Sequence, residues 1–135
     1  MVAKDVMGRR VKAPKKTAKG RDVAMKLLSD DYSSLPVVDD AGNVVGIISE
    51  FDILKALRAG KKLEEVTAEE IMTRQPLCVD EELSVEKLID IMTDKHLLRV
   101  PVVRDGKLVG SVSRRNIMDS FLTMEFKESF MILRS

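Results

Sequence analysis

Apolar residues along the chain recur first at helical spacing and then in short β-branched runs, and this order occurs twice. A stripe at helical spacing comes first, formed by Val23, Ala24, Leu27 and Leu28 in one half and by Val85, Leu88, Ile89 and Met92 in the other. Two apolar, β-branched runs follow each stripe, at 35–38 and 44–48 and again at 100–103 and 108–112. A glycine lies between the runs of each pair, and Asp105-Gly106 is a tight-turn pair. We therefore predict an amphipathic helix and then a β-hairpin in each half.

Shorter elements complete each half. A short helix is expected to end at Met7 and again at Met72, and Thr67 and Glu70 have the spacing of a capping box at the start of the second one. Short strands are predicted near 11–13 and 77–79. A last helix begins at Ser49 and at Ser113, and its expected apolar face comprises Ile53, Leu54 and Leu57 in the first half and Ile117, Met118, Phe121 and Leu122 in the second. Each half is thus a β-α-β-β-α unit behind a helical segment.

The two halves also match residue by residue. A shift of 65 positions places Met7 on Met72 and residues 35–38 on 100–103; after one residue is lost in a turn, a shift of 64 places Gly46 on Gly110 and Ser49 on Ser113. We therefore predict two domains, 1–60 and 61–135, the second with a C-terminal helical tail. One such unit is marginally stable alone. The expected fold is α/β (α+β), with two units related by a pseudo-twofold and packed sheet to sheet.

Composition narrows the classes of function. The chain has 135 residues, of which 44% are hydrophobic and 33% charged, as is typical of a globular domain. Its net charge of +1 provides no general attraction to nucleic acid or to an anionic membrane. Cys78 is the only cysteine, so the chain cannot form an intrachain disulfide or a Cys-rich zinc site. His96 is the only histidine, so few residues are available for Cys-His or Ser-His-Asp catalysis. We expect a buried, inert Cys78 thiol, no metal, no enzymatic activity and, because no apolar leader or membrane span is present, a cytoplasmic protein.

The repeated pattern resembles a known family. The run Leu35-Pro36-Val37-Val38-Asp39, then a glycine turn, then Val45-Gly46-Ile47-Ile48-Ser49-Glu50-Phe51-Asp52-Ile53-Leu54, repeated once in register, is similar to a tandem pair of cystathionine β-synthase (CBS) domains, often called a Bateman module. The resemblance extends from about Val2 to Leu122. It implies a stand-alone regulatory module that binds an adenosine-containing ligand (AMP, ADP, ATP or S-adenosylmethionine) in the cleft between paired domains. It also implies a homodimer that transmits ligand binding to a regulated partner protein, with no cofactor beyond that ligand.

The segment from Gly46 to Asp52 has the chemistry for such a ligand. A helix that begins after Ser49 offers free N–H groups and partial positive charge to a phosphate, and the Ser49 hydroxyl can add a hydrogen bond. The Asp52 carboxylate can accept hydrogen bonds from two ribose hydroxyls. All three fixed positions of the family pattern for ribose and phosphate, G-x-x-[ST]-x-x-D, are matched. The same spacing also describes a helix-capping box, and the two roles are compatible.

By the same resemblance, other residues are expected around the ligand. The adenine walls are Lys12, Ala13, Val37, Ile47 and Ile48, although the apolar residues among them also fit a core by pattern. In the second copy Ser113 is kept, but Asn116 replaces the acid and has one acceptor oxygen, so we expect a weak or altered second site. Arg99, Arg114 and Arg115 are candidate phosphate contacts. A solvated helix face is an equal alternative for Arg114 and Arg115, and His96 is expected at the surface.

The two ends of the chain suggest possible partners. Residues 1–21 carry eight basic side chains against Asp5 alone, which indicates a solvated face or, as an alternative, a nucleic-acid contact; no aromatic residue interleaves them to stack on bases. Residues 121–133 are apolar enough to continue the last helix and pack on a second subunit or partner, with fraying as the alternative. Three hypotheses therefore compete: an adenine-nucleotide sensor, an interaction module with a vestigial nucleotide site, and a nucleic-acid binder.

Overall fold

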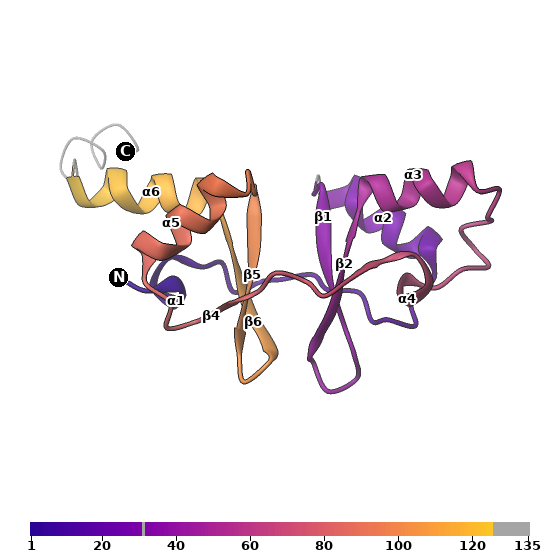
Figure 1. The fold of residues 1–135 in the computed structure, drawn as a ribbon, viewed down its shortest axis with the longest axis horizontal. Helices are drawn as coiled ribbons and strands as arrows, with labels where there is room; N and C mark the ends of the chain where they lie inside the picture. The colour runs from indigo at the N-terminus through magenta and orange to yellow at the C-terminus, as the bar shows by residue number, and fades with distance from the viewer. Residues whose placement is uncertain (31, 126–135) are drawn as a thin grey trace. The chain divides into compact units, whose positions relative to one another are not determined.

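The computed structural model describes residues 1–30 and 32–125, and it confirms a mixed α+β fold with two three-stranded sheets (Figure 1). In chain order its elements are α1 (Ala3–Val6), α2 (Gly20–Asp30), β1 (Ser34–Val38), β2 (Val44–Ser49), α3 (Glu50–Arg58), α4 (Ala68–Ile71), β3 (Thr73–Arg74), β4 (Val79–Asp80), α5 (Val85–Asp94), β5 (Arg99–Arg104), β6 (Lys107–Ser113) and α6 (Arg114–Glu125). The strand orders are β1-β2-β3 and β4-β5-β6. Within the described residues, every helix is too short or too polar to cross a bilayer.

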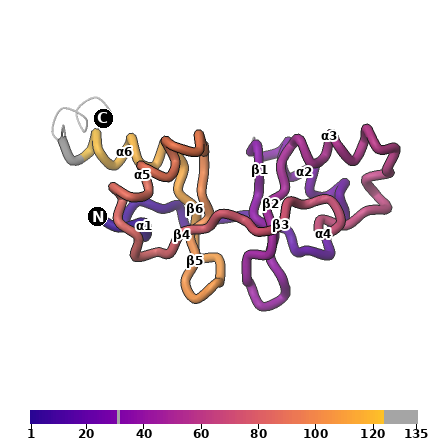
Figure 2. The backbone as a smooth tube through the Cα atoms, in the orientation of Figure 1, coloured from indigo at the N-terminus to yellow at the C-terminus, as the bar shows by residue number. Residues whose placement is uncertain are grey.

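The chain forms two compact units whose limits differ from those of the sequence repeats. Unit 1 comprises Met1–Val11, Cys78–Asp105 and the chain from Val109 onward, and unit 2 comprises Lys12–Leu77 with Gly106–Leu108. The predicted boundaries, 1–60 and 61–135, follow the repeat, whereas these units follow the packing. The largest difference concerns the opening helices: α1 of the first repeat belongs to unit 1, and α4 of the second repeat belongs to unit 2 (Figure 2).

Backbone hydrogen bonds hold α1 in unit 1. The Ala3 N–H donates to the Leu83 carbonyl at 2.8 Å, and Gly8 and Ser111 exchange a pair of N–H to carbonyl bonds at 2.9 and 3.0 Å. Ala3 is fully buried in the core of this unit. A residue of the first repeat is therefore enclosed by side chains of the second.

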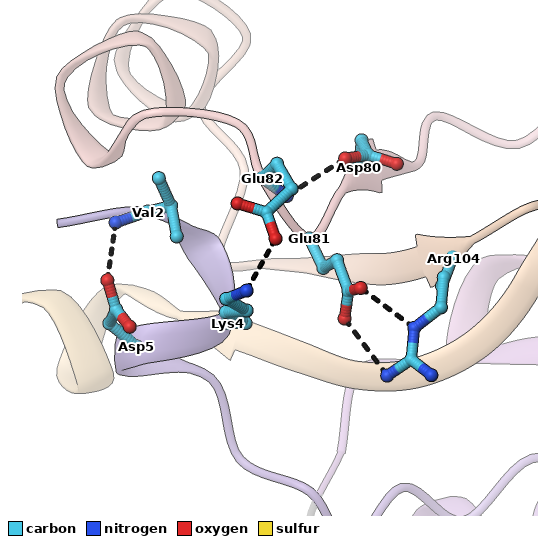
Figure 3. Close-up of polar contacts among 7 residues, drawn as sticks. All are labelled: Val2, Lys4, Asp5, Asp80, Glu81, Glu82 and Arg104. Atoms are coloured by element: carbon cyan, nitrogen blue, oxygen red, sulfur yellow. Dashed lines mark hydrogen bonds and ion pairs between the residues drawn. The ribbon is translucent and has the colours of Figure 1, made fainter.

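Ion pairs surround the same segment (Figure 3). Lys4 on α1 pairs with Glu82, and Arg104 at the end of β5 donates from Nε to Glu81 at 2.7 Å. The Glu82 carboxylate raises the pKa of Lys4, first through the hydrogen bond and then through its charge. The Lys4–Glu82 pair is largely exposed, so it orients α1 more than it stabilises it.

Helix α4 occupies the equivalent place in unit 2. The Ala68 N–H donates to the Ala18 carbonyl at 2.7 Å, and the Gly20 N–H donates to the Val66 carbonyl at 2.8 Å. Ala68, which a shift of 65 positions matches to Ala3, is also fully buried, in the core of unit 2. Each repeat thus contributes its opening helix to the unit built on the sheet of the other repeat.

The sheet of unit 2 places the candidate site. Strands β1 and β2 are antiparallel with Leu35 opposite Ile48, and both side chains are buried in the core. On the other edge of β2, the short strand β3 pairs antiparallel, with Thr73 opposite Ile47. Strand β3 was not predicted from the sequence, because two residues are too few to show a period.

The prediction of a strand near 11–13 is wrong. The chain instead makes a single parallel bridge two residues later, between Lys15 and Val38. In the second half, β4 forms within and just beyond the predicted segment and pairs in parallel with β5 through Val79 and Asp80. Pro14 occupies the position equivalent to Val79, and its missing N–H shortens the ladder.

Both predicted hairpins are present. In the second hairpin, Asp105 and Gly106 have φ of 52° and 82°, as a tight turn that matches strand twist requires. The first hairpin has a longer connection, in which the Asp39 carboxylate accepts from the Asn43 N–H at 2.9 Å and from the Asn43 amide at 3.1 Å. These bonds lower the pKa of Asp39.

The helix faces are less buried than the stripes predict. On α3, Asp52, Ile53 and Ala56 are buried, but Leu54 and Leu57 are more than half exposed. On α2, Leu28 is 81% exposed. The pattern therefore identified apolar faces correctly but not what covers them. Helix α6 runs to Glu125 as expected of the tail, and residues 126–135 lie outside the described residues.

Candidate functional site

Ser49 joins β2 to α3 and caps the helix. Its backbone is extended, with φ −118° and ψ 169°, as is usual for an N-cap residue. The Ser49 hydroxyl oxygen accepts a hydrogen bond from the Asp52 N–H at 3.3 Å. The first turn of α3, with its partial positive charge, therefore begins at the end of β2.

The Asp52 carboxylate is buried and accepts three hydrogen bonds. Its Oδ2 accepts from the Ser49 N–H at 2.8 Å and from the Ser49 hydroxyl at 3.1 Å. Its Oδ1 accepts from the Thr73 hydroxyl at 3.3 Å. The residue is 7% exposed, and a carboxylate this buried requires such partners. The capping box predicted from the Ser49 and Asp52 spacing is confirmed.

Thr73 is the group that sequence reasoning missed. It is an exposed residue of β3, two positions after α4, the opening helix of the second repeat, whereas Ser49 and Asp52 belong to the first. Its position after Met72 was the one available signal. That signal has meaning only when this segment is known to pair with β2.

Gly46, the first fixed residue of the motif, has a packing role. It is buried on β2 opposite Arg74, and a Cβ built there would lie 2.4 Å from the Met72 sulfur and 2.9 Å from the Thr73 carbonyl oxygen. No side chain fits in that space. The glycine therefore allows β3, and with it Thr73, to approach the strand that leads into Ser49 and Asp52.

Unit 1 repeats the cap with different chemistry. The Asn116 Oδ1 accepts from the Ser113 N–H at 2.8 Å, and the Ser113 hydroxyl accepts from the Asn116 N–H at 3.1 Å. Asn116 thus uses its single carbonyl oxygen for the cap, and its other polar atom is a donor. At the position equivalent to Thr73, unit 1 has Gly8, which has no hydroxyl.

The candidate phosphate contacts of unit 1 lie in two environments. The Arg99 guanidinium is half-buried and donates to the buried Ser111 hydroxyl at 2.9 Å. Arg114 and Arg115 are exposed in the first turn of α6. The structure therefore places one arginine within the sheet and leaves the other two on a solvated helix face.

The predicted adenine walls of unit 2 divide by burial. Val37 and Ile48 are fully buried core residues, as their alternative interpretation held. Ile47 and Ala13 are half-buried and retain surface. Lys12 is exposed and pairs with Asp30 at 2.9 Å.

Partners within unit 2 neutralise part of the basic N-terminal run. Besides Lys12 with Asp30, Lys16 lies 3.6 Å from Glu69. The Lys15 ammonium donates to the Asp39 carbonyl at 3.3 Å. This arrangement agrees with a solvated face rather than with a row of unpaired cations for nucleic acid.

The remaining candidate chemistry is sparse. Cys78 is half-buried, and burial raises the pKa of its thiol, which keeps it in the less reactive form. His96 is exposed, as predicted. Across 1–30 and 32–125, no three His, Cys, Asp or Glu side chains gather where they could hold a metal ion.

Comparisons with known sequences agree with the repeat. The family model described as CBS domain matches the chain twice, at residues 3–59 and 68–123. Uncharacterized protein MK0525 of Methanopyrus kandleri is 33% identical over 99 residues, which cover 72% of this chain and 50% of that protein. L-aspartate semialdehyde sulfurtransferase of Methanocaldococcus jannaschii is 38% identical over 101 residues, which cover 74% of this chain and 19% of that protein. The chain therefore spans half or less of these two relatives.

Two solved structures are similar over nearly their whole length. The CBS domain pair of protein MJ0100, in complex with 5′-methylthioadenosine and S-adenosyl-L-methionine, has a TM-score of 0.75 and 32% identity, and the match covers 93% of this chain and 98% of that one. CBSX2 of Arabidopsis thaliana in complex with AMP has a TM-score of 0.79 and 26% identity, with 92% and 98% covered. With both repeats matched by the family model and the fold shared with these pairs, the chain belongs to the CBS domain family, of which it contains two consecutive copies.

Proposed function

We propose that this chain is a regulatory module that binds an adenosine-containing ligand at the β2–α3 junction of unit 2. Two similar CBS pairs bind AMP in one case and 5′-methylthioadenosine with S-adenosyl-L-methionine in the other. Adenosine is the part that these ligands have in common. A site for ribose and adenine is therefore the feature that this chain is proposed to share.

The observation that carries the proposal is the Asp52 carboxylate at the start of α3. Oδ2 already accepts two hydrogen bonds, but Oδ1 accepts one, from Thr73. A carboxylate oxygen has about two acceptor directions, so one direction on Oδ1 is available to a ribose hydroxyl. The capping role is retained when the ligand binds, because it uses the other oxygen.

The surroundings of Asp52 suit the remaining parts of the ligand. The partial positive charge at the start of α3 favours a phosphate, where one is present. The Ser49 hydroxyl is not available as a donor to that phosphate, because it already donates to Asp52 Oδ2. Ile47 and Ala13 retain apolar surface on which adenine can pack. Unit 1 is proposed to hold a weaker site, because Asn116 uses its one acceptor oxygen for the cap.

Isothermal titration of the chain with AMP, ATP and S-adenosylmethionine tests the proposal. We expect at least one of them to bind and Asp52→Ala to lower its affinity about tenfold or more, since a charged hydrogen bond to the sugar is lost. The change also removes a helix cap and about 1 kcal/mol of stability.

Glu70→Ala separates these two effects. Glu70 forms the same kind of capping box with Thr67 at the start of α4, where its carboxylate accepts from the Thr67 N–H at 3.3 Å. The Glu70→Ala variant should lose about as much stability as Asp52→Ala and bind the ligand as tightly as the parent does. Equal binding by the Asp52→Ala variant would remove the sugar-binding role, and no binding by the parent would leave an interaction module with a vestigial site.

The response to ligand is proposed to pass through a homodimer to a regulated partner. Large apolar side chains are exposed on adjacent faces of α2 and α3, namely Met25, Leu28, Phe51, Leu54 and Leu57. Leu28 and Leu54 line a groove of about 230 Å³ between these helices. Contiguous apolar surface of this kind is typical of a protein interface. A ligand transmits a signal to the extent that it binds one arrangement of the assembly more tightly than another.

A further inference from the structure

Each unit has a shallow apolar groove between the two helices that flank its hairpin. One groove lies between α2 and α3 of unit 2 and the other between α5 and α6 of unit 1, and each has a volume of about 230 Å³ (Figure 1). Every residue that lines the α2–α3 groove is matched, at the shifts of 65 and 64 positions, by one that lines the α5–α6 groove. Leu54 and its equivalent Met118 are both more than half exposed, so both grooves present apolar surface to a partner.

The charges beside the two grooves are reversed. Among the described residues that line them, the charged ones are Glu50 in the α2–α3 groove and Arg114 in the α5–α6 groove, and these two occupy the same position of the repeat. Five residues further along the helix, Lys55 of α3 is matched by Asp119 of α6. All four side chains are exposed. Helix α3 thus has an acid followed by a base, and α6 has a base followed by an acid.

Phe51 and Arg115 form a further complementary pair of positions. Phe51 lines a second groove, of about 250 Å³, on the outer face of α3 together with Leu54 and Lys55. Its equivalent on α6 is the exposed Arg115. A guanidinium group can stack on the face of an aromatic ring, so these two residues also suit one another better than each suits a copy of itself.

Which grooves meet determines whether these charges attract. If α3 lies parallel to α3 of a second copy with equivalent residues opposite, Glu50 faces Glu50 and Lys55 faces Lys55. If α3 lies parallel to α6 of a second copy, Glu50 faces Arg114 instead. In the same alignment Lys55 faces Asp119. Opposite charges across an interface select the partner, and opposed like charges disfavour the wrong one.

We propose that the homodimer forms between unlike units: the α5–α6 groove of one copy covers the α2–α3 groove of the other, with α6 parallel to α3. The inference rests on the homodimer of the proposed function and specifies its arrangement. Each copy has one groove of each kind, so two copies can make the contact twice and close into a dimer that leaves neither groove uncovered.

Sedimentation equilibrium of charge-reversed chains tests this arrangement. An α3 variant carries Glu50→Arg with Lys55→Asp, and an α6 variant carries Arg114→Glu with Asp119→Lys, so each keeps the net charge of the parent. We expect either variant alone to raise the dissociation constant of the dimer about tenfold or more, because like charges then face one another in both contacts. All four changes in one chain should restore the parent value.

Lys61→Asp with Glu64→Arg is the matched control, because these exposed residues of the connection between α3 and α4 undergo the same exchange of charge. It should leave the dissociation constant unchanged. If α3 packed on α3, the changes on α6 could not rescue the α3 variant. An α3 variant that dimerises as the parent does, or one that the α6 changes fail to rescue, therefore overturns the proposal.

Disulfide trapping examines the same contact without a change of charge. In a Cys78→Ala background, chains that carry Leu54→Cys should form a mixed disulfide with chains that carry Met118→Cys, one of them lengthened by a tag so that the mixed product is recognised by its size. A disulfide between two Leu54→Cys chains would overturn the arrangement. A monomeric parent would overturn it together with the proposed homodimer, whereas failure to bind a nucleotide in the titration would overturn the ligand-binding proposal alone.

Discussion

Gly46 shows how one residue without a side chain determines the distance between two strands. Its neighbours across the gap are the Met72 thioether and the Thr73 carbonyl, and neither leaves room for a methyl group. The Met72 side chain can rotate away, but the carbonyl belongs to the backbone of β3 and cannot move alone. A larger residue at position 46 must therefore separate β3 from β2.

We predict that Gly46→Ala destabilises the protein by about 1–3 kcal/mol, the usual cost of overpacking. Gly8→Ala is the control, because a Cβ at Gly8 meets its nearest atom, the Ser111 carbonyl oxygen, at 3.9 Å and should cost less than about 0.5 kcal/mol. Urea denaturation of both variants gives the comparison. Similar midpoints for the two would show that the β2–β3 contact is not tight.

At the scale of elements, the exchange of α1 and α4 determines which parts of the chain stabilise one another. Ala3 and Ala68 have the same place in their repeats and are both fully buried, but in the cores of different units. A defect at either position therefore affects the sheet of the other repeat.

We predict reciprocal effects for Ala3→Asp and Ala68→Asp, because each buries an unpaired charge in one core. Ala3→Asp should increase amide hydrogen exchange in α5, β5 and β6, which all lie more than about 80 residues later in the sequence. Helix α2 and strands β1 and β2 should stay protected. Ala68→Asp should give the opposite pattern. Exchange that rises instead within the repeat carrying the substitution would contradict the division into these two units.

At the scale of the whole molecule, the exposed apolar faces of α2 and α3 require an explanation. Leu28 is 81% exposed and Phe51 is 73% exposed, although the same helices bury Val23, Leu27 and Ile53 on their other faces. When a helix is apolar on two sides, one side packs on the core of its own unit and the other is typical of a surface that contacts another protein.

We predict that Leu28→Glu combined with Leu54→Glu converts a homodimer to a monomer, because charges are placed in the groove that the second copy would fill. Light scattering after size-exclusion chromatography measures the mass. Leu77→Glu, on an exposed leucine outside these helices, should leave the mass unchanged. A parent that is already monomeric would disprove the proposed dimer.

The sequence predicted those elements whose patterns are local. Both hairpins, the amphipathic helices and the cap formed by Ser49 and Asp52 follow from residues within a few positions of one another. Strand β3 and the exchange of opening helices depend on pairing across the repeat boundary, and no local pattern carries that information. For the same reason Thr73 escaped notice, although its partner Asp52 was identified.

Burial could be predicted only in part. Leu54 and Leu57 lie on an apolar face, but periodicity shows which side of a helix is apolar and not whether this chain covers it. Val37 and Ile48 fitted both a core and a ligand wall, and their complete burial favours the core. Pro14 removed a predicted strand through one missing N–H.

The exchanged helices also bear on how such a chain could arise. A protein with a single copy of this repeat would have an opening helix with no site in its own sheet, and two separate molecules would have to trade helices before either was complete. Joining the copies in one polypeptide turns that encounter into an intramolecular step, independent of protein concentration. Cutting the gene at the repeat boundary should therefore give two fragments that regain structure when mixed and not when kept apart.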